Sequence, residues 1–303
     1  MQDKELNERL EQYECAGRIV PIERLSDLRE SIDEGRREGL IDAAVYDQYL
    51  KNFVFSPPET LPDAKSLIIV ASKQPQILFT FHKDGKKKQF FVPPTYLHAG
   101  ESDKRVADLL TDMLGGYRVV RANLPLKLLA AHSGLAVYGR NNLTYVPGMG
   151  SFHRLTAFYS DLPPHEKSEW KTLDTMKRCF ECQACTYKCP THALDQSRYR
   201  QYAEKCITFQ NEKPSDVPFP EWILPEWHNC IVGCMICQKI CPENLYHTGN
   251  VEDGPEFSEE ETAFLLEGVP LEKMPAELVK KLRDSDLDSL LDVLPRNLGA
   301  LLP

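Results

Sequence analysis

Nine of the ten cysteines in this chain lie within a single stretch of 63 residues. They are Cys179, Cys182, Cys185, Cys189, Cys206, Cys230, Cys234, Cys237 and Cys241, whereas Cys15 stands alone. The first residues lack the basic and then apolar order of a secretory signal, so we expect a cytoplasmic protein whose thiols stay reduced. Dense cysteines in a reduced compartment indicate a metal-binding protein rather than a disulfide scaffold.

The spacing of these cysteines favours iron–sulfur clusters over zinc. Residues 179–190 read Cys-x2-Cys-x2-Cys-x3-Cys-Pro, and residues 234–242 read a shortened copy, Cys-x2-Cys-x3-Cys-Pro. The longer pattern is that of bacterial ferredoxins, in which three closely spaced thiolates surround one cluster and the fourth binds the other. Zinc sites normally use two Cys-x2-Cys pairs, without a third close cysteine or a trailing proline. The sequence therefore predicts two 4Fe–4S clusters.

The same crossover rule divides the ligands between the two clusters. It assigns one cluster to Cys179, Cys182, Cys185 and Cys241. It assigns the other to Cys189, Cys234, Cys237 and one more residue, for which Cys206 and Cys230 compete. Cys230 would form a Cys-x3-Cys-x2-Cys loop, one residue longer than usual, so we favour Cys206 and expect Cys230 to be a small buried apolar residue. We expect Cys15 to lie in a helix without a chemical role.

The remainder of the chain predicts an α+β protein with three parts. Helical periodicity marks residues 1–16, 25–38, 103–114 and 125–133, and strand-like patterns mark 66–71, 117–120 and 153–159. The Asp84-Gly85 pair between residues 77–82 and 89–92 predicts a β-hairpin. We expect an α/β domain over residues 1–165, a ferredoxin-like double-cluster domain over 166–250 and an acidic helical tail over 251–303.

Charge is distributed unevenly along the chain. The formal net charge is −9, and residues 251–303 hold 13 acidic against 5 basic side chains, which leaves residues 1–250 close to neutral. Broad binding to a nucleic-acid backbone depends on an excess of Lys and Arg, so we do not expect a tRNA partner. No apolar run is long enough to span a bilayer, and we expect no membrane partner. The spaced leucines of the tail predict short amphipathic helices.

One segment of the first part has a composition unlike the rest. Residues 113–160, here called the acid-free segment, contain no Asp or Glu, although 45 of the 303 residues of the chain are acidic. The segment carries Arg, His, Gly and Asn residues, with a glycine-rich loop at 138–151. Glycine lets a backbone approach a ligand closely, and Asn and Ser supply neutral hydrogen bonds. This loop is a candidate binding site for a large ligand with amide or phosphate groups, or else a turn between strands.

Several of these pieces resemble the epoxyqueuosine reductases. They are residues 133–142 (SGLAVYGRNN), 150–155 (GSFHRL), 160–163 (SDLP) and 205–209 (KCITF), together with both cysteine motifs. The resemblance extends from about residue 60 to 245. Members of this family are cobalamin-dependent enzymes with two 4Fe–4S clusters, related to reductive dehalogenases, and their first domain has a nitroreductase-like α/β fold.

The resemblance implies that electrons pass through the two clusters to the cobalt of a corrinoid held by the acid-free segment. It also favours Cys206 as the eighth cluster ligand, since the family has a cysteine in a similar context. The corrinoid contacts that it implies are Tyr138, Gly139, Arg140, Asn141, Asn142, Gly150, Ser151 and His153. A low-potential donor such as a ferredoxin or flavodoxin would supply the electrons.

One departure from the family pattern bears on the reaction. Residues 120–125 read VRANLP, where the family carries an Asp that acts as the proton donor. Tyr138 and His153 are the weak candidates for a replacement donor. The sequence thus predicts an oxidoreductase that reduces a small substrate through a bound corrinoid. The alternatives are an electron-transfer protein that activates or processes a corrinoid or a corrinoid protein without an organic substrate, and a ferredoxin module fused to a structural domain.

Overall fold

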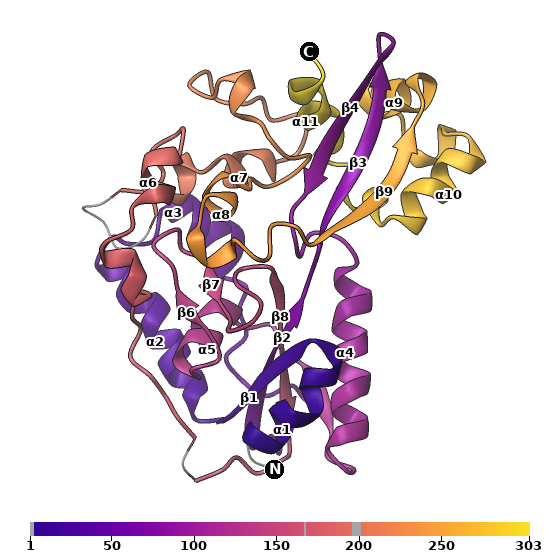
Figure 1. Cartoon of the computed structure of the whole chain (residues 1–303). Coiled ribbons are helices and arrows are strands. Elements are labelled where there is room, and N and C mark those ends of the chain that lie inside the picture. Colours follow the sequence, from indigo (N-terminus) through magenta and orange to yellow (C-terminus); the bar gives the residue numbers. More distant parts are fainter. Residues whose placement is uncertain (1–2, 167, 196–200) are drawn as a thin grey trace. The chain divides into compact units, whose positions relative to one another are not determined.

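The computed structural model describes residues 3–166, 168–195 and 201–303, which form two compact units (Figure 1). The first unit comprises the described residues of Met1–Lys73, Gly100–Gln183 and Gln196–Gln201, and the second comprises Gln74–Ala99, Ala184–Asp195 and Tyr202–Pro303. This division differs from the three consecutive domains predicted from the sequence. The reason is that the hairpin following residue 73 packs with the C-terminal residues instead of with the strands that precede it.

The first unit is built on a four-stranded antiparallel sheet. Its strands are β1 (Cys15–Pro21), β2 (Ser66–Lys73), β8 (His153–Ser160) and β5 (Val119–Arg121), in the order β1-β2-β8-β5. The predicted strands at 66–71 and 153–159 are confirmed, and the one at 117–120 begins two residues later than expected. Because both faces of β2 are covered, its sequence is a continuous apolar run without polar alternation.

Helices cover both faces of this sheet. Leu67, Ile69 and Ala71 of β2 pack with residues of α2 (Arg24–Arg37) and α5 (Leu126–His132). Ile68 and Val70 point to the other face and pack with residues of α1 (Asp3–Leu10) and α4 (Ala99–Met113). The remaining elements of this unit are α3 (Ala43–Val45), η2 (Tyr46–Leu50), the two short strands β6 (Val137–Tyr138) and β7 (Thr144–Tyr145), η1 (Glu11–Tyr13) and η3 (Lys177–Phe180).

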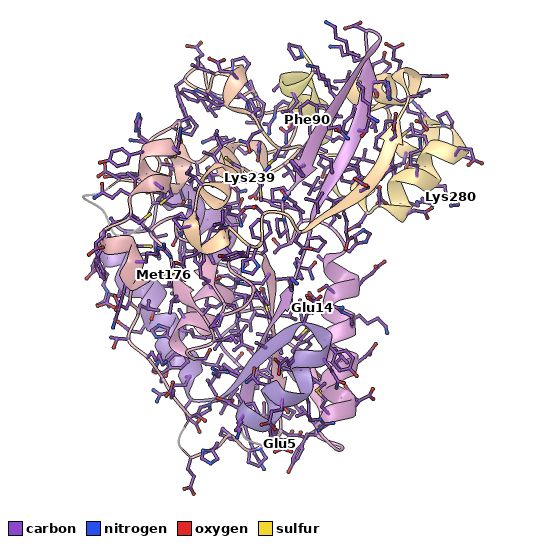
Figure 2. The ribbon with its side chains drawn as sticks, viewed as in Figure 1. Glu5, Glu14, Phe90, Met176, Lys239 and Lys280 are labelled. Atoms are coloured by element: carbon purple, nitrogen blue, oxygen red, sulfur yellow. The ribbon has the colours of Figure 1, made fainter. Side chains whose placement is uncertain are left out.

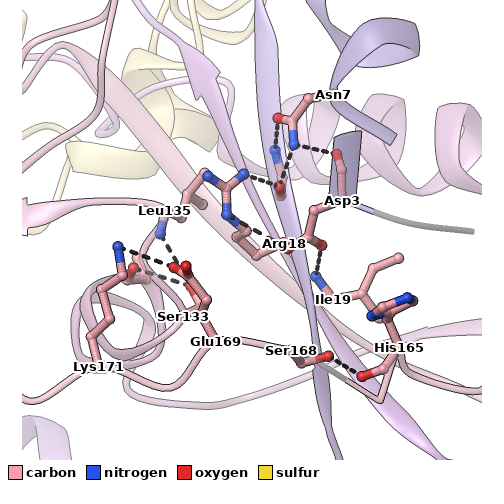
Figure 3. A network of polar contacts seen from close by, with 12 residues as sticks. Asp3, Asn7, Arg18, Ile19, Ser133, Leu135, His165, Ser168, Glu169 and Lys171 are labelled. Atoms are coloured by element: carbon pink, nitrogen blue, oxygen red, sulfur yellow. Dashed lines mark hydrogen bonds and ion pairs between the residues drawn. The ribbon is translucent and has the colours of Figure 1, made fainter. Parts of the chain in front are cut away.

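The N-terminal helix is shorter than predicted, and Cys15 does not lie in it. Cys15 is the first residue of β1, pairs with Ser72 and is buried. Polar contacts fix α1 to this strand instead (Figure 3). Asn7 exchanges two hydrogen bonds with the backbone of Gly17, each 2.9 Å long, and the Asp3 carboxylate accepts one of 2.9 Å from the Ile19 amide. The helical pattern of residues 1–16 therefore ends where strand pairing takes over.

The second unit contains a three-stranded sheet and most of the cysteines. Its strands are β4 (Lys86–Val92), β3 (Gln76–Lys83) and β9 (Val251–Phe257), in the order β4-β3-β9. The predicted hairpin is confirmed, with positive φ angles of 51° at Asp84 and 68° at Gly85. The helices and single turns of this unit are α6 (Ala184–Lys188), η4 (Ala203–Lys205), α7 (Ile207–Asn211), η5 (Pro225–Trp227), α8 (Ile236–Lys239), η6 (Pro242–Asn244), α9 (Glu259–Leu266), η7 (Leu271–Lys273), α10 (Ala276–Asp284), η8 (Leu287–Leu290) and α11 (Leu294–Leu301).

The acidic C-terminal residues are an integral part of this unit. The predicted short helices are present as α9, α10 and α11, and their leucines share one apolar core with Phe79 and Phe81 of β3. Strand β9, which pairs in parallel with β3, was not predicted. Its sequence, VEDGPEF, carries three acids, a glycine and a proline, all of which are depleted in strands. An edge position in the sheet tolerates them.

The arginines of the acid-free segment are paired with carboxylates from outside it. Asp103 of α4 lies 2.7 Å from Nε of Arg154 and 2.8 Å from Nη2 of Arg121, and it accepts a hydrogen bond of 2.8 Å from Thr156. Arg118 contacts Asp63 and Asp161, each at 2.8 Å. These three arginines therefore fasten α4 and two loops to the sheet.

Replacing Asp103 with Asn should destabilise the first unit by about 2 kcal/mol, because the half-buried Arg154 and the exposed Arg121 lose their counter-charge. Burial alone would raise the pKa of Asp103, but the hydrogen bonds from Arg154 and Thr156 and the two guanidinium charges lower it overall. The difference from the unaltered chain should thus be full above the usual Asp pKa of about 3.9 and shrink at lower pH. Urea unfolding of the full chain at several pH values measures it.

The matched control for this experiment is Asp108→Asn on the same helix. Asp108 forms an exposed pair with Lys104, four residues earlier, and exposed pairs contribute little to stability. An equal loss of stability in both variants would contradict the anchoring role of Asp103.

Candidate iron–sulfur centre

Four cysteine thiols gather in the second unit from three separate segments. Cys189 follows α6, Cys206 precedes α7, Cys234 lies two residues before α8, and Cys237 lies within α8. Helices α6 and α8, each carrying part of a cysteine motif, pack against each other. The four thiols interact electrostatically: Cys189, Cys206 and Cys234 all act on Cys237, as does Cys185, and Cys189 and Cys234 act on Cys206.

The chemistry of this donor set fits a 4Fe–4S cluster. Burial, with a smaller contribution from the neighbouring sulfurs, raises the pKa of Cys206 to about 11 and that of Cys237 well above its usual value. Adjacent thiolates at such a site need cationic iron to be stable. Within the described residues, no three His, Cys, Asp or Glu side chains converge as tightly as a single metal ion would require. A cube-shaped cluster spaces its thiolates further apart than one ion does.

Cys230, the competitor of Cys206, has different surroundings. It is 1% exposed, whereas Cys189, Cys206, Cys234 and Cys237 all keep part of their surface accessible. Its thiol donates to the side-chain oxygen of Asn229 over 3.2 Å. Burial and the neighbouring Cys234 raise its pKa to about 12. Cys206 thus interacts with both Cys189 and Cys234, whereas Cys230 interacts with Cys234 and is bonded to Asn229.

The loop from Cys230 to Cys234 is held on several sides by hydrogen bonds to its backbone. The Ile231 amide donates to the Phe91 carbonyl of β4 over 2.9 Å. Asn211 of α7 donates to the Gly233 carbonyl over 2.7 Å and accepts from the Gly233 amide over 2.9 Å. Asn297 of α11 donates to the Ile231 carbonyl over 3.0 Å. A glycine is required at position 233, where φ is 71° and a Cβ would lie 3.0 Å from Pro93 and Tyr96.

These supporting residues were not found from the sequence. Asn211, Asn229 and Asn297 are single asparagines with no characteristic spacing, and Asn297 lies 60 residues beyond Cys237. Lys239, labelled in Figure 2, is a further supporting residue that the sequence did not reveal. Its ammonium lies 3.8 Å from the centre of the Phe91 ring, and its charge acts on Cys230 and Cys234. The only available signal for Asn229 was its position next to a cysteine.

The four cysteines predicted for the other cluster are divided between the two units. Cys179 and Cys182 belong to the first unit, and Cys185 and Cys241 belong to the second. Within the first unit, the Cys179 amide donates to the Met176 carbonyl over 2.8 Å, and the Cys182 amide donates to the Arg178 carbonyl over 3.0 Å. Cys179 therefore lies in the turn η3, and Cys182, two residues after it, is bonded back to this turn. Met176, labelled in Figure 2, precedes this turn.

The glycine-rich loop predicted as a corrinoid contact is a compact hairpin in the first unit. Tyr138, Gly139, Asn141, Gly150, Ser151 and His153 are buried, and only Arg140 and Asn142 are partly exposed. Asn141 donates to the Tyr145 hydroxyl over 2.9 Å, and the Gly139 amide donates to the Leu143 carbonyl over 2.8 Å. At Gly139 a Cβ would meet the Tyr145 ring at 2.5 Å. Several of the hydrogen-bonding groups of this loop are thus bonded to other groups of the same hairpin.

This hairpin is attached to the segment that leads into Cys179. The Met176 amide donates to the Tyr138 carbonyl over 2.7 Å, and Thr175 forms a β-bridge with Tyr138. The Arg140 guanidinium lies 3.4 Å from the Cys179 carbonyl through both Nε and Nη2. A cation therefore lies beside the backbone of a predicted cluster ligand.

His153, a weak candidate for a proton donor, is buried and has partners at both ring nitrogens. Nδ1 lies 3.1 Å from the Gly150 carbonyl, which can only accept, so Nδ1 carries the proton and Nε2 accepts from the Thr144 hydroxyl at 3.1 Å. Burial lowers the pKa of His153 to about 4. At neutral pH its ring is uncharged and holds the hairpin together.

Comparison with known proteins identifies the family of the cluster domain and several relatives of the chain. Residues 178–244 match the family model of the 4Fe-4S double cluster binding domain. The epoxyqueuosine reductase of Alicycliphilus denitrificans is 31% identical over 147 residues, which are 47% of this chain and 39% of that protein. The corresponding enzyme of Staphylococcus aureus is 25% identical over 202 residues, covering 62% of this chain and 50% of that protein. These matches span half or less of each relative.

The solved epoxyqueuosine reductase of Streptococcus thermophilus superposes with a TM-score of 0.64 at 18% identity, covering 99% of this chain and 80% of that one. A selenomethionine-labelled epoxyqueuosine reductase gives 0.66 at 19% identity with the same coverage. The chain is similar to epoxyqueuosine reductases and carries their double 4Fe–4S cluster domain. The fold is therefore α+β with a double-cluster domain, as the sequence predicts. In the part of the chain that the structure describes, no helix is long and apolar enough to cross a membrane.

Replacing Cys206 with Ala should remove one cluster, whereas Cys230→Ala should leave both. After anaerobic reconstitution, iron and acid-labile sulfide should fall from about eight to about four per chain in the first variant only. A loss of iron in Cys230→Ala with full retention in Cys206→Ala would reverse the assignment. Both substitutions remove one thiol that interacts with Cys234, so each serves as a control for the other.

The ring of His153 should remain neutral, with its proton on Nδ1, at pH 6. Because its pKa is lowered, the unfolded chain binds a proton between pH 6.5 and about 4 while the folded chain does not. The free energy of unfolding should therefore decrease by up to about 3 kcal/mol as the pH is lowered through this range. Histidine-selective 15N NMR measures the tautomer, and Thr144→Val assigns the resonance by removing the donor to Nε2. A doubly protonated ring at pH 6 would contradict this prediction.

Proposed function

We propose that this chain is an iron–sulfur reductase that passes single low-potential electrons through two 4Fe–4S clusters to a corrinoid, for reductive chemistry on a small substrate. The observation that supports it best is the grouping of Cys189, Cys206, Cys234 and Cys237 within the stretch that matches a double-cluster domain. These four residues would hold one cluster. By the ferredoxin spacing, Cys179, Cys182, Cys185 and Cys241 would hold the other.

A bound corrinoid would supply a cobalt centre that accepts single electrons. The described hairpin fits such a ligand at two of the predicted positions, Arg140 and Asn142, which keep part of their surface exposed. Tyr138, Asn141 and His153 are buried, and the polar atoms of Asn141 and His153 serve the hairpin itself. Support for the corrinoid therefore comes from the similarity to epoxyqueuosine reductases, and no contact at Tyr138, Asn141 or His153 is needed for it.

A second candidate function is electron transfer to a corrinoid or corrinoid protein without an organic substrate. It is favoured by two observations: the acid-free segment has no carboxylate, and burial lowers the pKa of His153 so that its ring is neutral. Reductive cleavage of a bond to carbon or oxygen usually consumes protons as well as electrons, whereas reduction of cobalt consumes electrons alone. In both functions we expect a ferredoxin or flavodoxin as the electron donor. One solved epoxyqueuosine reductase carries a modified tRNA stem loop, but we expect no tRNA partner here.

Anaerobically reconstituted protein titrated with cobalamin tests the proposal. We expect the cobalt absorption spectrum to change to that of a base-off form with one corrinoid per chain, and a chemical reductant to reduce the bound cobalt through the clusters. A chain that assembles both clusters and leaves the cobalamin spectrum unchanged contradicts both corrinoid functions and leaves a ferredoxin module fused to a structural domain. The variant lacking Cys206 is the control, because it should bind cobalamin but reduce it more slowly.

If cobalamin binds, two substrates separate the candidate functions. Turnover of RNA that contains epoxyqueuosine would support a substrate-reducing enzyme and would contradict the expectation of no tRNA partner. Reduction of the cobalt of a separate corrinoid protein, with no turnover of the RNA, would support the second candidate.

A further inference from the structure

The side chain of Asn229 uses both ends of its amide next to a predicted cluster ligand. Its oxygen, Oδ1, accepts the Met235 amide over 3.0 Å and the Cys230 thiol over 3.2 Å. Its nitrogen, Nδ2, donates to the Trp227 carbonyl over 3.1 Å and to Sγ of Cys234 over 3.2 Å. This amide therefore links the loop before α8 to the sulfur of Cys234.

The orientation of this amide is fixed by its partners. A backbone N–H can only donate and a backbone carbonyl can only accept, so the atom facing Met235 must be Oδ1 and the atom facing Trp227 must be Nδ2. Flipping the amide would break both contacts. The group that faces Sγ of Cys234 is consequently an N–H donor.

We propose that Asn229 is a positioning residue that raises the reduction potential of the cluster held by Cys189, Cys206, Cys234 and Cys237, by donating an N–H···S hydrogen bond to Cys234. This inference rests on the proposed iron–sulfur function. Reduction adds an electron to the cluster and increases the negative charge on its sulfurs, so a fixed donor stabilises the reduced form more than the oxidised form. The positive charge of Lys239, in α8, also acts on Cys234 and raises the potential in the same direction.

The Asn229 donor is held in a fixed position beside this cluster. Its amide nitrogen lies 3.2 Å from Sγ of Cys234. The backbone of the loop is fixed at Gly233 and Ile231 by hydrogen bonds from Asn211 and Asn297. The donor therefore keeps its position when the charge of the cluster changes, which makes this cluster easier to reduce.

Two substitutions test the inference. Asn229→Asp keeps an oxygen for Met235 and Cys230 but removes the N–H donor and adds a charge, and Asn229→Ser removes the N–H donor without adding a charge. In both we expect about eight irons per chain and a more negative midpoint potential for this cluster, measured by redox titration followed by EPR. A tenfold higher ratio of oxidised to reduced cluster at fixed potential, equal to about 59 mV for one electron, is the expected size.

Cys230→Ala is the matched control, since it leaves the donor to Cys234 in place and should keep the potential of the unaltered chain. A second readout is pulsed EPR on reduced protein with 15N-labelled asparagine side chains. It should show a 15N coupling to the cluster that both Asn229 variants lose.

The outcomes separate this inference from the proposed function. An unaltered chain that assembles no clusters overturns the function and the inference together. Intact clusters with an unchanged potential in Asn229→Ser overturn the inference alone, because a shift seen only in Asn229→Asp would be due to the added charge. Loss of the cluster in both variants also overturns it, since Asn229 would then serve assembly and not potential.

Discussion

Mutual repulsion among buried thiolates is the constraint on which the second unit depends. Cys189, Cys206, Cys234 and Cys237 lie close together, and burial and the neighbouring sulfurs raise the pKa of Cys206, Cys234 and Cys237. Such a group is unfavourable unless positive charge compensates it. Iron supplies most of that charge when a cluster is bound, and the Asn229 amide and the Lys239 ammonium supply a smaller, permanent part.

A site of this kind needs a rigid frame, and the frame comes from distant parts of the chain. Strand β4, helix α7 and helix α11 each fix the backbone between Cys230 and Cys234. The buried Asn297 also donates to the Asn211 carbonyl over 2.8 Å, so the two asparagines form one network around the loop. This explains why the acidic C-terminal residues pack as part of the second unit: α11 carries a side chain that the cluster loop requires.

The sequence predicted well what depends on local spacing. The cysteine patterns, the Asp84-Gly85 turn and the apolar run of β2 all follow from short-range geometry, and the structure contains the turn and the strand as expected. It predicted poorly what depends on tertiary pairing. Cys15 lies in a strand because β2 pairs with it, and β9 is a strand because β3 accepts it in parallel, although its own composition opposes this.

The site shows the same contrast. The spacing of the motifs identified the cysteines, and the looser loop disfavoured Cys230, which the structure finds buried and bonded to Asn229. The composition of the acid-free segment, in contrast, did not show that its arginines are paired. Asp63, Asp103 and Asp161 lie outside the segment in sequence but next to its arginines in space. A composition window cannot register charges that the fold brings in from elsewhere.

The pairing of these arginines has a consequence for the chemistry. With Arg118, Arg121 and Arg154 bound to carboxylates, Arg140 is the arginine of the segment that contacts the predicted cluster region, through the Cys179 carbonyl. A cation there favours the arrival of an electron, just as the Asn229 donor does at the other cluster. In the described part of this segment no carboxylate is present and the buried His153 ring is neutral. The described residues around the predicted clusters are thus suited to moving electrons, and a protonation step would use another donor, such as Tyr138, the substrate, water or a partner.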